Sequence, residues 1–201
     1  MLNDKIDLIV LYCQKMNYRL FTGKDEKNII YVEGMDVEGN FNNDAPNQFN
    51  DVRLVLSNDF HLLGNWSATT EPGRFYTEHP MNPKGAARIA FGQYKAWAVG
   101  MHGNSQPHEA LIQVAEVMVY RDSNKDGLRI GDGVDRGLFG INQHWGYDLP
   151  PDNIGRASAG CLVGRTRKGH LEFMSIVKTD PRYQADRRFL FTTTIIPGDQ
   201  L

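Results

Sequence analysis

The sequence predicts a single α+β domain, residues 1–201, that is rich in β-strands. Its 201 residues are the usual size of one domain with its own hydrophobic core. Apolar residues make up 41% of the chain, which argues against disorder. The 20 Gly and 9 Pro, together with short β-branched and aromatic runs, are typical of a turn-rich sheet protein and not of a helical bundle.

The N-terminal part predicts one helix followed by two strands. Residues 4–16 carry apolar side chains at helical spacing, so we expect a helix within residues 1–20. Residues 27–33 and 52–56 are β-branched or alternating runs, which favours strands. The segment 34–51 between them is rich in Asn, Asp and Gly and is predicted to be a long loop.

The rest of the chain predicts further strands and a second helix. In chain order we expect two short strands within 87–99, strands at 110–120 and 137–142, a helix at 169–179 and a strand at 188–196. Residues 110–120 suit either state, but the alternation in their second half favours a buried strand. This divides the domain into a β-rich core over residues 27–165 with mixed, twisted sheets, followed by a C-terminal helix and strand over 166–201.

The charge balance argues against two classes of partner. The chain has 22 Lys and Arg against 24 Asp and Glu, whereas nucleic-acid and anionic membrane surfaces are bound by an excess of Lys and Arg. No apolar stretch approaches the length of a membrane span, so neither nucleic-acid binding nor membrane insertion is expected. The N-terminus lacks the features of a secretory signal, which predicts a cytoplasmic protein, or one released by lysis or carried on a virion.

Cys161 is the candidate nucleophile of this sequence. It follows the small, polar segment 158–160, whereas Cys13 lies in the apolar run of the predicted N-terminal helix. His144 lies 17 residues before Cys161, and the Pro-rich loop between them can fold back to bring imidazole and thiol together. An imidazole that takes the thiol proton creates the reactive thiolate. The alternative is that Cys161 is a buried structural thiol.

The segments 144–146 (His-Trp-Gly) and 158–161 (Ser-Ala-Gly-Cys) resemble the signature of the L,D-transpeptidase catalytic domain, the YkuD-like family, in a divergent branch of bacterial and phage-type proteins. Residues 70–75 also resemble a turn that precedes the active-site strands of that family. The resemblance implies a YkuD-like fold and a cysteine enzyme that acts on peptidoglycan stem peptides through an acyl-enzyme.

The resemblance also implies roles for individual residues. Cys161 would be the nucleophile and His144 the base, Gly160 would belong to the oxyanion region, and Ser158 would supply the hydroxyl of the motif. Four further residues are expected to bind substrate: Arg165 as a partner for a carboxylate, and Trp145, Tyr147 and His102 as walls of the pocket. Aromatic residues such as Trp145 and Tyr147 are more often part of the packed core than of a binding wall.

Three functions therefore stay open at this point. The first is a cysteine-dependent hydrolase or L,D-transpeptidase, with hydrolysis favoured because Ala159 stands where the family has a second His. The second is a non-catalytic module that binds peptidoglycan or builds a virion. The third is a metal-dependent hydrolase that uses His102, His108 and Glu109, although their spacing fits no standard zinc motif.

No cofactor is required by the first function, but one loop matches part of a calcium site. Asp122, Asn124 and Asp126 stand at positions 1, 3 and 5 of a calcium loop, with Gly127 at position 6. The closing acid expected at position 12 is absent there, and Asp132 stands one residue earlier. The loop is therefore either a structural Ca²⁺ site or an Asx-rich turn between two strands.

Overall fold

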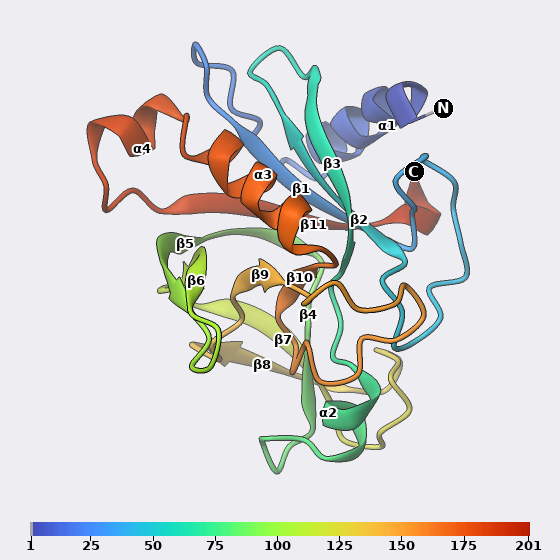
Figure 1. The fold of residues 1–201 in the computed structure, drawn as a ribbon. Coiled ribbons are helices and arrows are strands. Elements are labelled where there is room, and N and C mark those ends of the chain that lie inside the picture. The colour runs from blue at the N-terminus through green and yellow to red at the C-terminus, as the bar shows by residue number, and fades with distance from the viewer. Residues whose placement is uncertain (1) are drawn as a thin grey trace.

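The computed structural model describes residues 2–201 and consists of a closed eight-stranded barrel with a separate three-stranded sheet beside it (Figure 1). Around the barrel the strands run β1 (Asn28–Glu33), β11 (Phe191–Pro197), β5 (Gly92–His102), β6 (His108–Gln113), β9 (Gln143–Trp145), β10 (Leu162–Gly164), β3 (Leu62–Thr69) and β2 (Asp51–Leu56). The second sheet has the order β4 (Ala86–Ile89), β7 (Val117–Asp122) and β8 (Gly133–Gly137). The predicted β-rich α+β class is confirmed.

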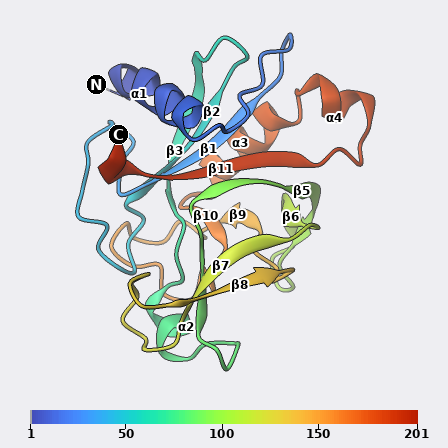
Figure 2. The same cartoon turned by 180° about the vertical axis from the view of Figure 1, so that it is seen from behind.

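Within residues 2–201, four α-helices and one 3₁₀ turn accompany the two sheets. They are α1 (Leu2–Lys15), α2 (Arg74–Glu78), α3 (Arg167–Val177), α4 (Pro181–Ala185) and the 3₁₀ turn η1 (Gly198–Gln200). α1 packs against the barrel through an apolar cluster of its own, and α3 contributes to the main core. The two ends of the chain lie side by side in both views (Figures 1 and 2), where Tyr12 of α1 donates a hydrogen bond to Gln200 at 3.3 Å. None of the helices described in residues 2–201 combines the length and apolar character needed to cross a bilayer.

Every residue of strand β1 is buried, because its side chains point alternately into two apolar layers. Ile29 and Tyr31 belong to the main core inside the barrel, whereas Ile30 and Val32 pack under α1. Successive side chains of a strand point to opposite faces, so the middle of a strand between two apolar layers must be apolar on both faces. The predicted N-terminal helix is thus the outer layer that β1 requires.

Several predicted elements need correction. Residues 110–120 form two strands, β6 and β7, and residues 138–142 form no strand. The amide of Gln113 accounts for the second difference, because its Oε1 accepts the backbone N–H groups of Phe139 and Ile141 at 3.1 and 2.8 Å. A segment whose N–H groups are already satisfied by a side chain needs no neighbouring strand.

Strands β3, β8 and β10 and the short helices α2 and α4 were not predicted, and β9 begins one residue after the predicted strand at 137–142. β3 (LLGNWSAT) contains Gly64 and Asn65, which disfavour strands, and β10 has only three residues. Both are defined by their partners, since β3 pairs with β2 on one side and β10 on the other. Propensity is weaker than such pairing. The segment 70–75, which resembles the turn of the YkuD-like family, follows β3 directly and its end lies in α2, while α4 follows the helix predicted at 169–179.

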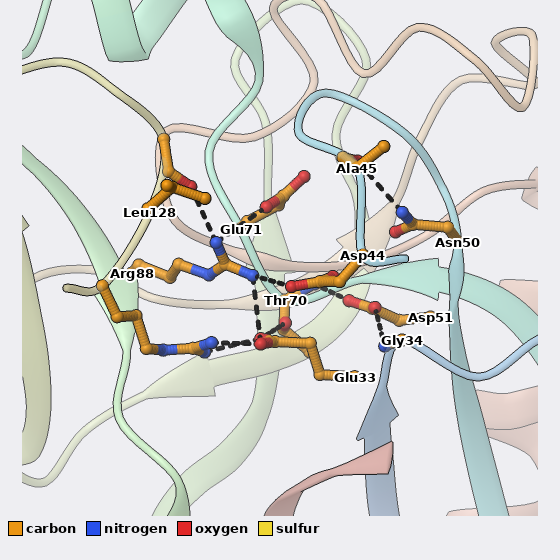
Figure 3. Close-up of polar contacts among 12 residues, drawn as sticks. Glu33, Gly34, Asp44, Ala45, Asn50, Asp51, Thr70, Glu71, Arg88 and Leu128 are labelled. Carbon is orange, nitrogen blue, oxygen red and sulfur yellow. Dashed lines mark hydrogen bonds and ion pairs between the residues drawn. The ribbon is translucent and has the colours of Figure 1, made fainter. Parts of the chain in front are cut away.

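A buried ion network joins the barrel to the three-stranded sheet (Figure 3). Arg88 of β4 lies 3.0 Å from Glu33 at the end of β1 and 3.2 Å from Glu71 after β3, and it also pairs with Asp44. Arg129, from the segment between β7 and β8, forms a second ion pair with Glu33. Each partner sits on a different segment, so the network fixes the position of β4 against the barrel.

The network is a balance between desolvation and attraction. Burial alone would raise the pKa of Glu33, but Arg129 and Arg88 hold it at about 2. Thr70 adds a hydrogen bond of 2.7 Å to the same carboxylate. Burial and the charge of Glu33 raise the pKa of Asp51 to about 8. Glu33 therefore stays ionised between its two arginines, whereas Asp51 favours its neutral form at neutral pH. A buried charge such as that of Glu33 is stable only with its partners in place.

We predict that Glu33→Gln lowers the free energy of unfolding at pH 7 by about 3–5 kcal/mol, because it leaves two buried guanidinium groups without their shared carboxylate. The measurement is urea unfolding of both proteins. The folded pKa of Glu33 lies below its usual 4.5. Its contribution is therefore complete above pH 4.5 and is lost as the pH falls toward 2.

The matched control is Glu116→Gln. Glu116 pairs with Arg136 at 2.9 Å, but both side chains are more than half exposed, and such surface pairs contribute at most about 1 kcal/mol. Equal losses in the two variants would contradict a special role for the buried network.

Candidate active site

The largest cavity described lies at the junction between the barrel and the three-stranded sheet. It has a volume of about 470 Å³ and is lined by segments that are far apart in the chain. Ala87 comes from β4, Arg121 from β7 and His102 from the end of β5, while Gly160 and Cys161 form the turn before β10. Cys161 is half-buried, so its thiol belongs to the wall of an open pocket.

The thiol of Cys161 favours its protonated form at neutral pH. Burial raises its pKa to about 11, although a backbone hydrogen bond from Asn142 opposes the shift. Its Sγ donates a hydrogen bond to the carbonyl oxygen of Gly140 at 3.5 Å. No imidazole nitrogen among residues 2–201 is hydrogen-bonded to this sulfur. The predicted contact between His144 and Cys161 is therefore absent from this state of the site.

Ser158 and Gly160 determine the shape of the turn that carries Cys161. Ser158 is fully buried; its hydroxyl donates to the carbonyl of Cys161 at 2.9 Å and accepts from the N–H of Gly160 at 3.1 Å. Gly160 has φ +123°, and a Cβ there would lie 2.3 Å from the carbonyl oxygen of Ala87. Only glycine fits this approach between the turn and β4. Ser158 and Gly160 thus shape the turn.

The same turn leaves one donor free. The backbone N–H of Cys161 has no hydrogen-bond acceptor among the residues that the structure describes. A free N–H on the nucleophile itself is the geometry that stabilises an oxyanion during acyl transfer. The sequence predicted an oxyanion role for the region of Gly160, and the structure offers the N–H of the next residue for it.

Two stacked histidines lie beside the pocket. The rings of His102 and His144 are 3.9 Å apart between centroids and almost parallel, at 13°. His102 lines the cavity, whereas His144 is only 2% exposed and lies behind it. Burial lowers the pKa of both imidazoles, and the nearby His102 lowers that of His144 further. Both rings are therefore neutral at neutral pH.

Hydrogen bonds fix opposite tautomers in these two rings. Nδ1 of His144 lies 2.8 Å from the carbonyl oxygen of Trp145, which can only accept, so Nδ1 carries the proton and Nε2 carries a lone pair. Nδ1 of His102 lies 3.0 Å from Nδ2 of Asn142, which can only donate. The amide of Asn142 is oriented by Gln113, whose N–H donates to Oδ1 at 2.9 Å. His102 therefore carries its proton on Nε2.

The four predicted substrate-binding residues separate into two groups. His102 lines the cavity, and Tyr147 packs against the same apolar cluster as Cys161. Trp145 instead stacks on the ring of His108, with 3.7 Å between the ring centroids. Arg165 does not line the cavity, and its guanidinium donates a hydrogen bond to the carbonyl of Leu149 at 3.1 Å. The sequence analysis missed Arg121, whose signal is a charge at the end of an apolar strand (VMVYR).

The predicted metal ligands are occupied with other contacts. Asp122 accepts the N–H groups of Asp126 and Gly127 at 3.1 and 2.9 Å, and Asn124 donates to Asp126 at 2.7 Å. These bonds are those of an Asx-rich turn. Burial and the nearby carboxylates of Asp122 and Asp126 raise the pKa of Asp132, which shows that Asp132 lies close to this turn. Calcium binding by the loop stays a prediction.

The zinc hypothesis has no matching ligand geometry. Glu109 forms an ion pair with Lys178 at 2.6 Å, and Nδ1 of His108 bonds to the carbonyl of Gln106 at 2.9 Å. Within residues 2–201, no group of three or more His, Cys, Asp or Glu is arranged to hold a metal ion.

Comparison with known proteins gives no assignment: no family model, no curated protein and no solved structure matches this chain. The YkuD-like resemblance therefore stays a hypothesis that rests on the residues of the motif.

We predict that Gly160→Ala lowers the free energy of unfolding by about 3 kcal/mol, because it combines a left-handed φ with a contact to Ala87 that forces the turn and β4 apart. Gly131→Ala is the matched control, since Gly131 has φ +88° but open space around it. Chemical denaturation of both variants isolates the contact. A loss in Gly160→Ala no greater than that in Gly131→Ala would show that the approach to β4 is unimportant.

We also predict that Cys161 titrates near pH 11 in the free protein, well above the usual value of about 8.5 for a free thiol. Because no imidazole contacts its sulfur, His144→Ala should leave this pKa unchanged. The pH dependence of alkylation, followed at the Cys161 peptide by mass spectrometry, measures it. A pKa below 8 that rises in His144→Ala would show that a thiolate–imidazolium pair forms without substrate.

Proposed function

We propose that this protein is a cysteine-dependent acyl-transfer enzyme that hydrolyses or transpeptidates peptidoglycan stem peptides through a Cys161 acyl-enzyme. The observation that carries the proposal is the position of Cys161 in the wall of the 470 Å³ cavity, with its own backbone N–H free. The choice of peptidoglycan rests on the resemblance of residues 144–146 and 158–161 to the L,D-transpeptidase motif.

The chemistry assigns one role to each polar group. Sγ of Cys161 attacks the carbonyl carbon of a substrate amide while the thiol proton passes to Nε2 of His144. The oxyanion of the tetrahedral intermediate accepts the N–H of Cys161. His144 then returns the proton to the leaving amine, and a thioester remains. Attack by water releases an acid, and attack by a second amine forms a cross-link; in both cases the thiol is regenerated.

The tautomer of His144 supports its role as base. Its Nδ1–H is held by the carbonyl of Trp145, which orients the ring and leaves Nε2 able to accept a proton. The protonated resting thiol of Cys161 requires that substrate binding brings Sγ and this ring into contact. Hydrogen bonds of this kind often tighten only in the substrate complex.

We predict that Cys161→Ala abolishes the release or cross-linking of stem peptides from purified sacculi, and that His144→Gln lowers the rate by about 10²–10⁴ because the proton acceptor is lost. Intact-mass spectrometry of the wild type mixed with stem peptides should show an acyl adduct that maps to Cys161. Unchanged activity in Cys161→Ala would overturn the mechanism.

The second candidate is a non-catalytic module that binds peptidoglycan. The raised pKa of Cys161 and its hydrogen bond to Gly140 favour it, because an inert buried thiol has both properties. This candidate predicts that wild type and Cys161→Ala bind sacculi with the same affinity, that no stem peptide is released and that no adduct forms.

A further inference from the structure

The lining of the cavity around Cys161 contains several side chains that can donate hydrogen bonds. No Asp or Glu side chain lines it among the residues that the structure describes. The charged group that lines it is the guanidinium of Arg121, and the neutral ring of His102 also lines it. A pocket with one cation and no carboxylate is electrostatically suited to an anionic group.

The guanidinium of Arg121 is held by protein contacts at Nε and Nη1, while Nη2 forms no hydrogen bond within residues 2–201. Nε pairs with Asp135 at 3.2 Å, Nη1 donates to the carbonyl of Gly85 at 3.5 Å, and the guanidinium lies 4.5 Å over the ring of Phe139. Nη2 has no acceptor among residues 2–201, although the whole residue is only 6% exposed. A fixed, buried guanidinium loses little side-chain freedom when it binds an anion.

His102 offers a second donor of a different kind. Because Asn142 donates to its Nδ1, the neutral ring carries its proton on Nε2. Nε2 has no partner among the described residues and is not buried away from solvent. The ring cannot accept a proton at Nε2 in this tautomer, so it acts as a donor toward the cavity, whereas His144 behind it has the opposite tautomer.

We infer that this cavity recognises a free carboxylate on the substrate, held by Nη2 of Arg121 with Nε2–H of His102 as a neutral donor in the same cavity. The inference rests on the proposed function for the reaction at Cys161, but carboxylate recognition itself needs only the cavity. The substrates it selects are acyl donors that carry an ionised carboxyl group near the carbonyl under attack. This inference assigns the carboxylate to Arg121, which lines the cavity, in place of Arg165, which does not.

The test compares two alkylating reagents of nearly equal size, iodoacetate and iodoacetamide, which differ in charge. Their rates at Cys161 are measured at pH 8.5 by mass spectrometry of the Cys161 peptide, and the same pair is measured with glutathione as a free thiol. The ratio of the two rates cancels the fraction of thiolate, so a shifted thiol pKa does not affect it. The longer pair iodoacetylglycine and iodoacetylglycinamide tests a carboxylate placed further from the sulfur.

We predict that, in at least one of the two pairs, the carboxylate reagent is favoured at Cys161 by about tenfold over its ratio with glutathione, because Arg121 attracts the anion. Arg121→Gln should remove this preference. Asp135→Asn should increase it, because it removes the carboxylate that offsets the charge of Arg121. Simple loss of structure would change both variants in the same direction.

Arg136→Gln is the matched control, since it removes the same charge from a side chain on β8 that is 70% exposed. A wild-type ratio equal to that of glutathione in both pairs, or an equal loss in Arg136→Gln and Arg121→Gln, would overturn the inference. Active enzyme without carboxylate preference would overturn only the inference. Carboxylate preference without an acyl-enzyme would overturn only the proposed function.

Discussion

Arg88 connects the two sheets of this protein, and the candidate site depends on that connection. Its guanidinium is 4% exposed and pairs with Glu33 of the barrel and Glu71 beyond β3. The next residue toward the N-terminus, Ala87, contacts the turn at Gly160 and lines the cavity. Ion pairs that are strong only when complete therefore fix one wall of the pocket (Figure 3). The cavity that contains Cys161 lies between two sheets held together by buried charge.

The same burial explains the resting state of the site. A thiol and two imidazoles that are removed from water all favour their neutral forms, which raises the pKa of Cys161 and lowers those of His102 and His144. Backbone and amide partners then decide which nitrogen of each ring carries a proton. The thiol of Cys161 and the two imidazoles are thus uncharged at neutral pH, and the charged side chain that lines the pocket is that of Arg121.

The local parts of this arrangement were predictable from the sequence, and the distant ones were not. The turn at 158–161 is determined by its own residues, because the hydroxyl of Ser158 forms hydrogen bonds with the backbone of Gly160 and Cys161. The barrel depends on β3 and β10, whose short or polar sequences become strands only beside their partners. Arg121 reaches the pocket through β7, which pairs with β4 far from Cys161 in the chain, so no spacing in the sequence reveals it.

The most direct test of this account is the alkylation rate of Cys161 by iodoacetamide in Arg88→Gln, compared with wild type at the same pH and in the absence of denaturant. If the ion network fixes the wall formed by β4, its loss should open the junction and raise the rate at Cys161 by at least about tenfold, while Cys13, on the buried face of α1, reacts as slowly as before. A less stable protein with an unchanged rate at Cys161 would contradict the account, because the network would then stabilise the fold without shaping the site.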